Sequence, residues 1–339
     1  MEIIAGDIGG TKSRLAWMAG TDFASQKLRF ERVYASADFS DAGALLRQFM
    51  RDAQMTSAPD CLTLALPGVV EMKLARLTNL DWTLDADALG RALGIPAVQF
   101  INDFQAAALA VATLTERDTL MLNPSPVQSG GVRAITGAGT GLGLAWMQAG
   151  ADGHYRAYAT EGGHIDFAPA NAQQSRLLDF VRREPDVAGQ PAHVSWERMV
   201  SGLGLGAIYR FCCFESAGTL PVITADGARV SELAAQGDAV ANSTLDLFVD
   251  LYGAWVGNVA LLYQPVGGLY IAGGVAIHLQ QRMQSQRFMA ACTDKGRMRG
   301  VVERTPIFLI TNKRLGVQGA IAFSCQPTAL NRNLARTEL

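Results

Sequence analysis

The sequence predicts an α/β protein of two lobes with a cleft between them. Three observations support this prediction: the length of 339 residues, the order of the apolar segments, and a strand–turn–strand pattern that occurs twice. A chain of this length is too long for one ordinary core and divides naturally into two domains of roughly 100 to 200 residues. Strands followed by helices indicate lobes built on mixed sheets.

The first lobe is expected to begin with short apolar strands separated by turns. Strands are predicted at residues 3–8, 13–18 and 28–35, which form a β-meander, and later at 62–66 and 98–101. Helical spacing over residues 42–53 predicts a helix. The alanine-rich segment 104–114 has strong helix propensity and follows a strand directly.

The pattern of strand and turn starts again after Asn123-Pro124-Ser125-Pro126. Strands at 133–136 and 143–148 flank a glycine-rich turn, and the two passages overlay at an offset of about 129 residues. Residues 15–18 and 144–147 then both read Leu-Ala-Trp-Met, and Asp7 faces Thr136. One such pattern in each half is what a duplicated nucleotide-binding lobe would leave behind.

The charge balance favours a small ligand over a polyanion. With 29 basic and 31 acidic residues, no broad positive field exists to capture nucleic acid or an anionic membrane surface. Residues 251–281 carry no charge, but glycines and Pro265 interrupt them, so they are expected to form buried core.

The N-terminus and the cysteines favour a protein that is not exported. An acidic residue, Glu2, stands in second place, and neither a basic region nor a cleavable apolar stretch follows. The five cysteines are an odd number without C-x-x-C spacing, so neither a disulfide framework nor a thiolate zinc site is favoured. Reduced thiols in the cytoplasm are expected.

The two glycine turns have a structural and a functional interpretation. Glycines after a strand let backbone N–H groups point inward as a cradle for phosphate oxygens, but a hairpin that needs positive φ uses glycine too. Two related turns with internal threonines favour the cradle. The chain contains no G-x-G-x-x-G match beginning at Gly137 or Gly139, and no Walker A loop.

Polar residues at the ends of two predicted strands also have two interpretations. Asp7 ends an apolar strand, where it either caps the turn at Gly9 or pairs with Mg²⁺ bound to phosphates. Asn102-Asp103 precedes a helix, where it either caps the helix or supplies a base that accepts a proton from a sugar hydroxyl.

A third polar group places an acid and an imidazole on either side of two glycines, in Glu161-Gly162-Gly163-His164. A solvated turn is the structural interpretation, because Gly-Gly segments with polar flanks are common. The functional interpretation is a compact set of acceptors and donors for vicinal hydroxyls.

Eight segments stand in the order and separation of a known family. Five of them are Asp7-Ile8-Gly9-Gly10-Thr11 with Arg14, Ile101-Asn102-Asp103-Phe104, Gly137-Ala138-Gly139-Thr140-Gly141-Leu142-Gly143, Glu161-Gly162-Gly163-His164-Ile165-Asp166-Phe167-Ala168-Pro169 and Ile271-Ala272-Gly273-Gly274-Val275. Three more are Thr78-Asn79-Leu80-Asp81-Trp82, Glu197-Arg198-Met199-Val200-Ser201-Gly202 and Asp294-Lys295-Gly296-Arg297. Together they resemble bacterial glucokinase of the hexokinase superfamily over residues 2–323.

The resemblance implies a fold and a reaction. The implied fold is a two-lobed actin-like ATPase (ribonuclease H-like) fold, with duplicated mixed-sheet domains and a central cleft. Residues 1–112 and 314–330 would form the small domain, 113–313 the large domain, and 331–339 a tail. The implied reaction is transfer of the γ-phosphate of ATP to the 6-hydroxyl of glucose at the start of glycolysis, with Mg²⁺, by a cytoplasmic homodimer.

The resemblance also implies roles for individual residues. Asp103 would be the catalytic base and also contact the sugar. The other implied sugar ligands are Asn79, Asn102, Glu161, His164 and Glu197. The implied nucleotide-binding residues are Gly6, Asp7, Ile8, Gly9, Gly10, Thr11, Gly137, Gly139, Thr140 and Gly141, with Gly273 and Gly274 near the adenosine. Asp7 would hold Mg²⁺, directly or through water.

Lys12 departs from the glucokinase pattern, which often has Asn there, and Gly-Gly-Thr-Lys is similar to the related ROK kinases. ROK proteins carry a cysteine zinc motif that has no counterpart here, which leaves His164 available for sugar. Two alternative functions remain: a kinase for another hexose, which the intact Glu161 and His164 permit, and a non-catalytic sugar-sensing regulator, against which both Asp7 and Asp103 argue.

Overall fold

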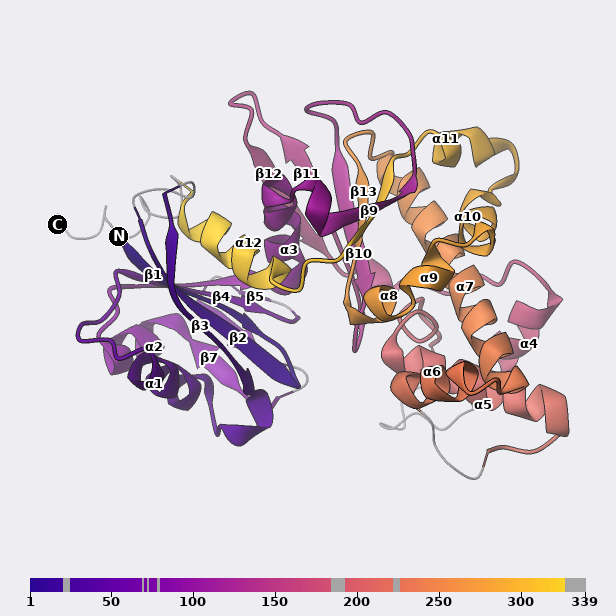
Figure 1. The fold of residues 1–339 in the computed structure, drawn as a ribbon, viewed down its shortest axis with the longest axis horizontal. Coiled ribbons are helices and arrows are strands. Elements are labelled where there is room, and N and C mark those ends of the chain that lie inside the picture. The colour runs from indigo at the N-terminus through magenta and orange to yellow at the C-terminus, as the bar shows by residue number, and fades with distance from the viewer. Residues whose placement is uncertain are drawn as a thin grey trace. The chain divides into compact units, whose positions relative to one another are not determined.

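The chain forms two compact units. The computed structural model describes residues 1–20, 25–68, 70–71, 73–77, 80–183, 193–221 and 226–326. Unit 1 comprises Met1–Leu114, Tyr155–Ala159 and the chain from Asn312 onward, and unit 2 comprises Thr115–His154 and Thr160–Thr311. The chain therefore leaves unit 1 to build unit 2, contributes the short segment Tyr155–Ala159 to unit 1 on the way, and finally returns to complete unit 1 (Figure 1).

Unit 1 is built on a five-stranded sheet of order β3-β2-β1-β4-β8. Its strands are β1 (Glu2–Ile8), β2 (Lys12–Ala19), β3 (Lys27–Ala35), β4 (Cys61–Leu66) and β8 (Ala97–Asn102). The first three are antiparallel neighbours, whereas β1, β4 and β8 are parallel. The predicted meander and the two later strands are confirmed. A small antiparallel sheet adds β5 (Val70–Glu71), β6 (Leu74–Arg76) and β7 (Thr83–Asp85).

The alternation of side chains along β1 decides which helices cover each face of this sheet. Ile4 and Ile8 belong to the core that contains Leu45 of α1 (Ala42–Asp52). Ile3 and Ala5 belong instead to the core that contains Val317 of α12 (Leu315–Ser324). Helices α2 (Ala86–Leu93) and α3 (Asp103–Ala110) complete the unit, and α12 packs beside α3 from the opposite end of the chain (Figure 1). The expected helix at 104–114 is α3 followed by the 3-10 turn Val111–Thr113.

The second large sheet has six strands in the order β12-β11-β10-β13-β14-β9. They are β9 (Thr119–Asn123), β10 (Arg133–Ala138), β11 (Leu142–Ala149), β12 (Tyr155–Thr160), β13 (Leu269–Ala272) and β14 (Ile307–Ile310). Here β10 pairs antiparallel with β11 and parallel with β13, which pairs parallel with β14. The order and directions of β2-β1-β4-β8 therefore recur in β11-β10-β13-β14, as the repeated sequence pattern predicts.

The register of the two hairpins corrects the overlay expected from sequence. Leu15 pairs with Gly6, whereas its counterpart Leu144 pairs with Thr136. The second turn is one residue shorter, because three residues separate the last paired positions of β10 and β11 and four separate those of β1 and β2. Asp7 therefore corresponds to Gly137 and not to Thr136. The fixed offset of 129 residues missed this because it ignores the residue that the second turn lacks.

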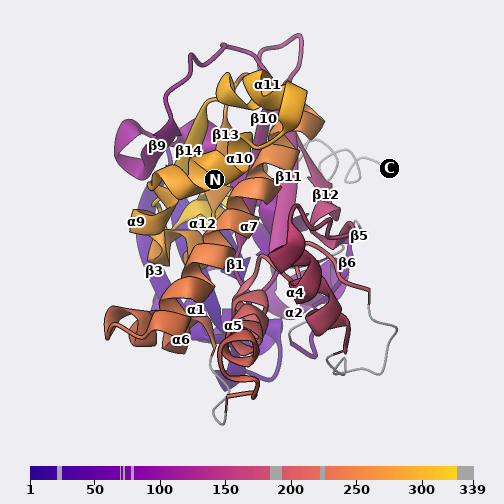
Figure 2. The ribbon, with the colours of Figure 1, turned by 90° about the vertical axis from the view of Figure 1, so that its right-hand side faces the viewer.

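Unit 2 has one large core around α7 (Ala239–Tyr263), which contacts α5, α6 and α10 (Figures 1 and 2). Among the described helices, α7 is long and apolar enough to cross a membrane. However, 72% of its most apolar stretch is buried inside the protein. The expectation that residues 251–281 form buried core is confirmed for α7 and β13.

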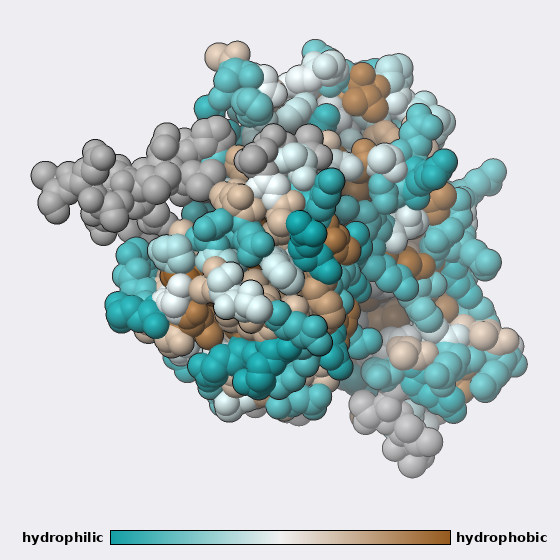
Figure 3. Space-filling model, turned by 60° about the vertical axis from the view of Figure 1, so that its left-hand side comes forward, coloured by the Kyte–Doolittle hydropathy of each residue, from teal (hydrophilic) through white to brown (hydrophobic). Residues whose placement is uncertain are grey.

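The remaining elements of unit 2 are α-helices and short 3-10 helices. They are η3 (Glu116–Asp118), η4 (Gly162–His164), α4 (Ala172–Arg183), α5 (Gly202–Ala217), α6 (Gly227–Ala235), α8 (Gly274–His278), α9 (Gln280–Met283), α10 (Gln286–Thr293), η5 (Gly296–Met298) and α11 (Arg299–Glu303). On the molecular face drawn in Figure 3, hydrophobic residues lie in separate patches among hydrophilic ones, in keeping with the apolar side chains buried in the cores.

Candidate active site

The parallel strands of unit 1 bring the predicted polar residues to one edge of the sheet. Asp7 of β1 lies opposite Ala65 of β4, and Ala65 lies opposite Ile101 of β8. Two strand spacings separate the backbones of Asp7 and Ile101, or about 10 Å. Because Asn102 and Asp103 follow Ile101 immediately, unit 1 holds all three predicted polar residues at the carboxyl edge of its parallel strands.

Asp7 lies on the face of β1 that α12 covers, since it follows Ile3 and Ala5 in the alternation. Its carboxylate lies against Gly316 in the first turn of α12, where an added Cβ would collide with it. Burial raises the pKa of Asp7 to about 6, and the nearby Arg14 opposes that shift. Arg14 itself forms an ion pair with Glu31 at 2.6 Å.

The surroundings of Asp7 fit a magnesium ion bound mainly through a ligand. No hydrogen bond to its carboxylate is formed among the described residues, so its oxygens are available. The described residues contain no group of three or more metal-ligating side chains. One carboxylate is sufficient for Mg²⁺ that keeps its waters and is also held by phosphates. The residues therefore suit Mg²⁺ carried by a nucleotide.

Asn102 is the N-cap of α3, as one of the two interpretations predicts. Its side-chain oxygen accepts a hydrogen bond from the Gln105 N–H at 3.0 Å, and its amide nitrogen donates to the Gly68 carbonyl at 3.1 Å. Asp103 is the first residue of the helix, is half-buried, and accepts a hydrogen bond from the Phe104 N–H at 2.8 Å. The cap fixes the backbone that carries Asp103.

The first glycine turn is a hairpin tied to a neighbouring segment. The Gly9 N–H donates to the Lys12 carbonyl at 3.1 Å, and the Ser36 hydroxyl donates to the Gly9 carbonyl at 2.6 Å. A second hydrogen bond joins the hydroxyls of Ser36 and Ser13 at 2.9 Å. Ser36 thus fixes the turn through hydrogen bonds to Gly9 and Ser13. Thr11, on the same turn, is exposed.

Unit 2 brings together three predicted sugar ligands. His164 Nδ1 lies 3.9 Å from Glu197 Oε1, and His164 Nε2 lies 3.9 Å from Glu161 Oε2. The side chains of Glu161 and His164 are 60% and 59% exposed, so both can reach a ligand, whereas that of Glu197 is 31% exposed. The sequence separates Glu197 from the others by more than thirty positions, and the fold makes them neighbours.

Close backbone packing explains the two glycines inside this cluster. A Cβ at Gly163 would collide with the Leu142 carbonyl, and a Cβ at Gly162 would press on the Leu144 side chain. The Glu197 N–H donates to the Gly163 carbonyl at 2.9 Å, which fixes Glu197 beside η4. The segment is therefore a 3-10 turn packed on β11 and not merely a solvated turn.

Glu197 also joins the sugar-ligand cluster to the second glycine turn. Its Oε2 accepts a hydrogen bond from the Leu142 N–H at 2.9 Å, directly after the turn. A Cβ at Gly141 would collide with the same oxygen. Within the turn, the Gly139 N–H donates to the Gly141 carbonyl at 2.8 Å.

The second glycine turn adjoins Gly273 and Gly274. Gly137 lies opposite Ala272 in the parallel register, so close to it that a Cβ would collide with the Ala272 backbone. Gly273 has φ of +96° and packs against the Ala138 backbone, a conformation and a contact that favour glycine. The predicted nucleotide-binding segments of unit 2 thus lie together at the carboxyl edge of its parallel strands.

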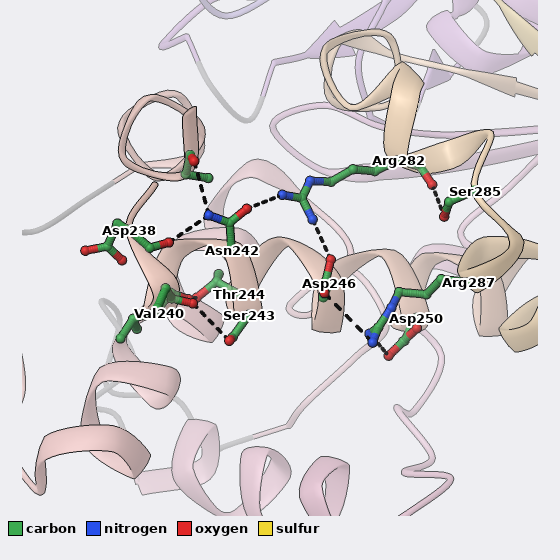
Figure 4. Close-up of polar contacts among 12 residues, drawn as sticks. Asp238, Val240, Asn242, Ser243, Thr244, Asp246, Asp250, Arg282, Ser285 and Arg287 are labelled. Atoms are coloured by element: carbon green, nitrogen blue, oxygen red, sulfur yellow. Dashed lines mark hydrogen bonds and ion pairs between the residues drawn. The ribbon is translucent and has the colours of Figure 1, made fainter. Parts of the chain in front are cut away.

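A cavity of about 730 Å³ opens between α6, α7 and residues 277–282, at the C-terminal end of α8. One wall is braced by Arg282 of α9, which bonds to Asp246 and, at 2.6 Å, to Asn242 of α7 (Figure 4). Arg287 continues this ladder along α7 with an ion pair to Asp250 at 2.9 Å (Figure 4). The cavity is large enough for a small organic ligand.

Some residues near the site have no signal in the sequence, and one predicted ligand is not described. His193 contacts the Asp166 carboxylate at 3.2 Å and the His164 carbonyl at 3.1 Å. Tyr252 of α7 reaches Ala138 beside the second turn. Both contacts join segments distant in sequence, which spacing alone does not indicate. Asn79 lies outside the described residues.

Sheets of the same strand order with a glycine turn at each carboxyl edge suit a protein that handles phosphates, and the neighbouring carboxylates supply acceptors for hydroxyls. The fold and the site define this protein as a sugar kinase. Within that class the chain belongs to the glucokinase family, kinases that phosphorylate glucose, because the model of that family matches residues 4–327.

Individual relatives agree with the family assignment. The glucokinase of Trichormus variabilis is 37% identical over 337 residues, with 94% of this chain and 97% of the relative covered. The solved structure of a glucokinase from an Antarctic psychrotroph is 29% identical, with a TM-score of 0.79 and 95% and 98% of the two chains covered. The expected resemblance is confirmed.

The ROK kinases are more distant. A ROK family glucokinase from Streptomyces griseus, solved in complex with glucose and AMPPNP, is 20% identical with a TM-score of 0.61, and 95% and 98% of the chains are covered. It shares the fold with this chain. The family is decided by the family model and by the more similar relatives, so the similarity of Lys12 and its neighbours to ROK sequences does not change it.

Proposed function

We propose that this protein transfers the γ-phosphate of ATP to the 6-hydroxyl of glucose. The observation that carries the proposal is the convergence of Glu161, His164 and Glu197 beside the second glycine turn, in a chain of the glucokinase family. Glucose and AMPPNP are the ligands of the Streptomyces griseus protein that shares the fold. We extend both ligand classes to this chain.

The sugar would be held by hydrogen-bond acceptors and donors. Glu161 and Glu197 accept hydrogen bonds from ring hydroxyls, His164 can donate or accept, and Asn102 and Asn79 add amides. A sugar that differs in one hydroxyl would leave one of these groups unpaired, at a cost of about 1–3 kcal/mol. The site is thus suited to discriminate between hexoses.

Asp103 would act as the general base. In phosphoryl transfer, the protein contributes mainly by positioning the reactants and by stabilising charge. A half-buried carboxylate on the capped start of α3 is well placed to accept the proton of the attacking hydroxyl. The proton leaves the sugar oxygen as that oxygen bonds to phosphorus, and the bond from the γ-phosphorus to the bridging oxygen breaks to release ADP.

The nucleotide would lie along the glycine segments. Residues 6–11 and Gly137, Gly139, Thr140 and Gly141 would line the phosphates. Gly273 and Gly274 would lie near the adenosine, whose base the cavity beside α8 could hold. Bound Mg²⁺ would neutralise phosphate charge, and Asp7 would hold it directly or through water.

The finer architecture and setting belong to the same proposal. We assign the actin-like, ribonuclease H-like fold with a central cleft, a small domain of residues 1–112 and 314–330, and a large domain of 113–313. The tail at 331–339 lies outside the described residues. We further propose a cytoplasmic homodimer that acts at the start of glycolysis and binds neither nucleic acid nor membrane, as the charge balance favours.

An ADP-release assay across glucose, mannose, fructose and glucosamine tests the proposed function. We expect the highest kcat/KM with glucose. A higher kcat/KM with another hexose would identify the alternative sugar kinase. Absence of ADP release with every sugar, combined with measurable glucose binding, would identify a sugar-sensing regulator.

A further inference from the structure

The hydroxyl of Tyr252 supports the backbone at the second glycine turn. Tyr252 belongs to α7, its side chain is fully buried, and its ring packs edge-on against Phe248 and Phe288. Its hydroxyl oxygen accepts a hydrogen bond from the Ala138 N–H at 3.0 Å. The aromatic contacts fix the ring, so the position of the hydroxyl is fixed as well.

Ala138 is the place where the strand needs such support. The pairing of β10 with β13 ends with Gly137 opposite Ala272. Gly273, the residue that follows Ala272 at the end of β13, has φ of +96° and leads the chain into α8. Ala138 therefore lies one position beyond the parallel pairing and directly before Gly139, where the turn begins.

Two other segments hold the rest of the turn. The Gly202 N–H donates to the Gly139 carbonyl at 2.9 Å, and the Leu142 N–H donates to Glu197 at 2.9 Å. No side chain of the described residues packs within 4 Å of the Cβ position of Gly139, so among them the turn is open on that side. Hydrogen bonds with Tyr252, Gly202 and Glu197 thus tie the turn to three other segments, and the one with Tyr252 holds the strand end.

We propose that Tyr252 is a positioning residue for the phosphates of the nucleotide. This inference rests on the proposed function of the glycine turn. Donors that face a transferring phosphate must hold their positions closely, because small displacements at a reacting group reduce rate and affinity. By holding the Ala138 N–H, the hydroxyl fixes the backbone that leads into the Gly139–Gly141 turn (residues 139–141).

The test compares two conservative substitutions that each remove a hydroxyl bonded at β10, one from α7 and one from the strand itself. Tyr252→Phe removes the acceptor and keeps the ring. Thr136→Val, the matched control, removes a buried hydroxyl that accepts from Trp255 at 2.8 Å and donates to the Gly143 carbonyl at 2.8 Å, two positions before Ala138. Both variants lose buried hydrogen bonds from the same region, so a purely structural role would affect both alike.

We expect Tyr252→Phe to raise the KM for Mg-ATP about tenfold and to weaken AMPPNP binding in calorimetry by a similar factor. Its KM for glucose should stay within about twofold of the wild type. Thr136→Val should lower Tm comparably but leave AMPPNP affinity unchanged.

Wild-type AMPPNP affinity in Tyr252→Phe, or an equal loss in both variants, would overturn the proposal. A wild-type protein that binds AMPPNP but phosphorylates no sugar would instead refute the proposed function, because AMPPNP binding is measured without turnover.

Discussion

At the scale of single residues, Glu197 links two parts of the site in unit 2. One carboxylate oxygen accepts the Leu142 N–H at the glycine turn, and the other lies 3.9 Å from His164. A sugar that draws the carboxylate toward its hydroxyls therefore acts on the turn as well. Glu197 thus couples the proposed sugar contacts to the turn that we propose for phosphate.

Asp103→Asn is the direct test of the proposed base. The amide preserves the size of the side chain but cannot accept a proton from the sugar hydroxyl. We expect kcat to fall by about 10² to 10⁴, with sugar binding largely kept. Steady-state kinetics and glucose calorimetry measure the two quantities, and turnover near that of the wild type would remove Asp103 from its role.

Asp7 is expected to make stability depend on pH. Burial raises its pKa to about 6, against about 3.9 in an unfolded chain. Between these values the folded protein keeps a proton that the unfolded chain has lost, so this contribution to stability is complete below about pH 4 and is lost as pH rises through 6. Ionised Asp7 therefore destabilises the free protein at neutral pH.

Asp7→Asn resembles the protonated form and tests this expectation. The variant should exceed the wild type in Tm at pH 7.5, with a smaller difference at pH 4.5, and should need more Mg-ATP for half-maximal rate. Thermal melts of both proteins at both pH values provide the measurement, with the exposed Asp81→Asn as a control for the substitution itself. An identical Tm difference at both pH values contradicts the prediction.

At the scale of elements, α12 and α3 pack unusually closely because Gly319 of α12 faces the Ala106 backbone of α3. A Cβ at this glycine would collide with the Ala106 carbonyl, so the helices could not keep their separation. Since α3 begins with Asp103, this contact also sets the position of the proposed base.

Gly319→Ala should therefore destabilise the protein, by about 1–3 kcal/mol for an overpacked contact. Urea denaturation measures the free energy of unfolding. Gly300→Ala in α11 is the matched control, because the nearest atom to its Cβ position belongs to the flexible end of Arg304. The control should be neutral or slightly stabilising, as alanine favours helix over glycine; equal stability of Gly319→Ala and the wild type would contradict the packing argument.

The elements that the sequence predicts well are those with a local signal. The five strands of the large sheet in unit 1 and α1 follow from hydrophobic patterning, and α3 follows from the helix propensity of its alanines. The cap at Asn102 follows from residue type. The shorter second hairpin, the addition of β9 to β14 and the contact of Tyr252 with Ala138 were not predictable, because each depends on which distant segments meet. The approach of Glu197 to His164 came from family resemblance and not from spacing.

At the scale of the whole molecule, the return of the chain to unit 1 is the main architectural fact. Val317, Ala320 and Ile321 of α12 complete the core against β1, β2 and β4. Without α12, apolar side chains on that face of the sheet, such as Ile3 and Ala5, would be exposed to water.

Truncation tests the contribution of α12. A chain that ends at Thr311 should be insoluble or aggregate on expression, because one face of the unit 1 sheet loses its cover. A chain that ends at Gln326 keeps α12 and serves as the control, with wild-type secondary structure expected by circular dichroism. A soluble protein of native-like thermal stability after truncation at Thr311 would contradict this account.

The same path of the chain determines the order of events during translation. The described strands and helices of unit 2 leave the ribosome before α12 does, whereas the sheet of unit 1 must wait for α12 to be synthesised. The nascent N-terminal segment therefore stays incomplete while later residues fold, a reversal of the usual N-to-C sequence of domain folding. Chaperones that bind exposed apolar strands would find their target on the face of β1 and β2 that α12 later covers.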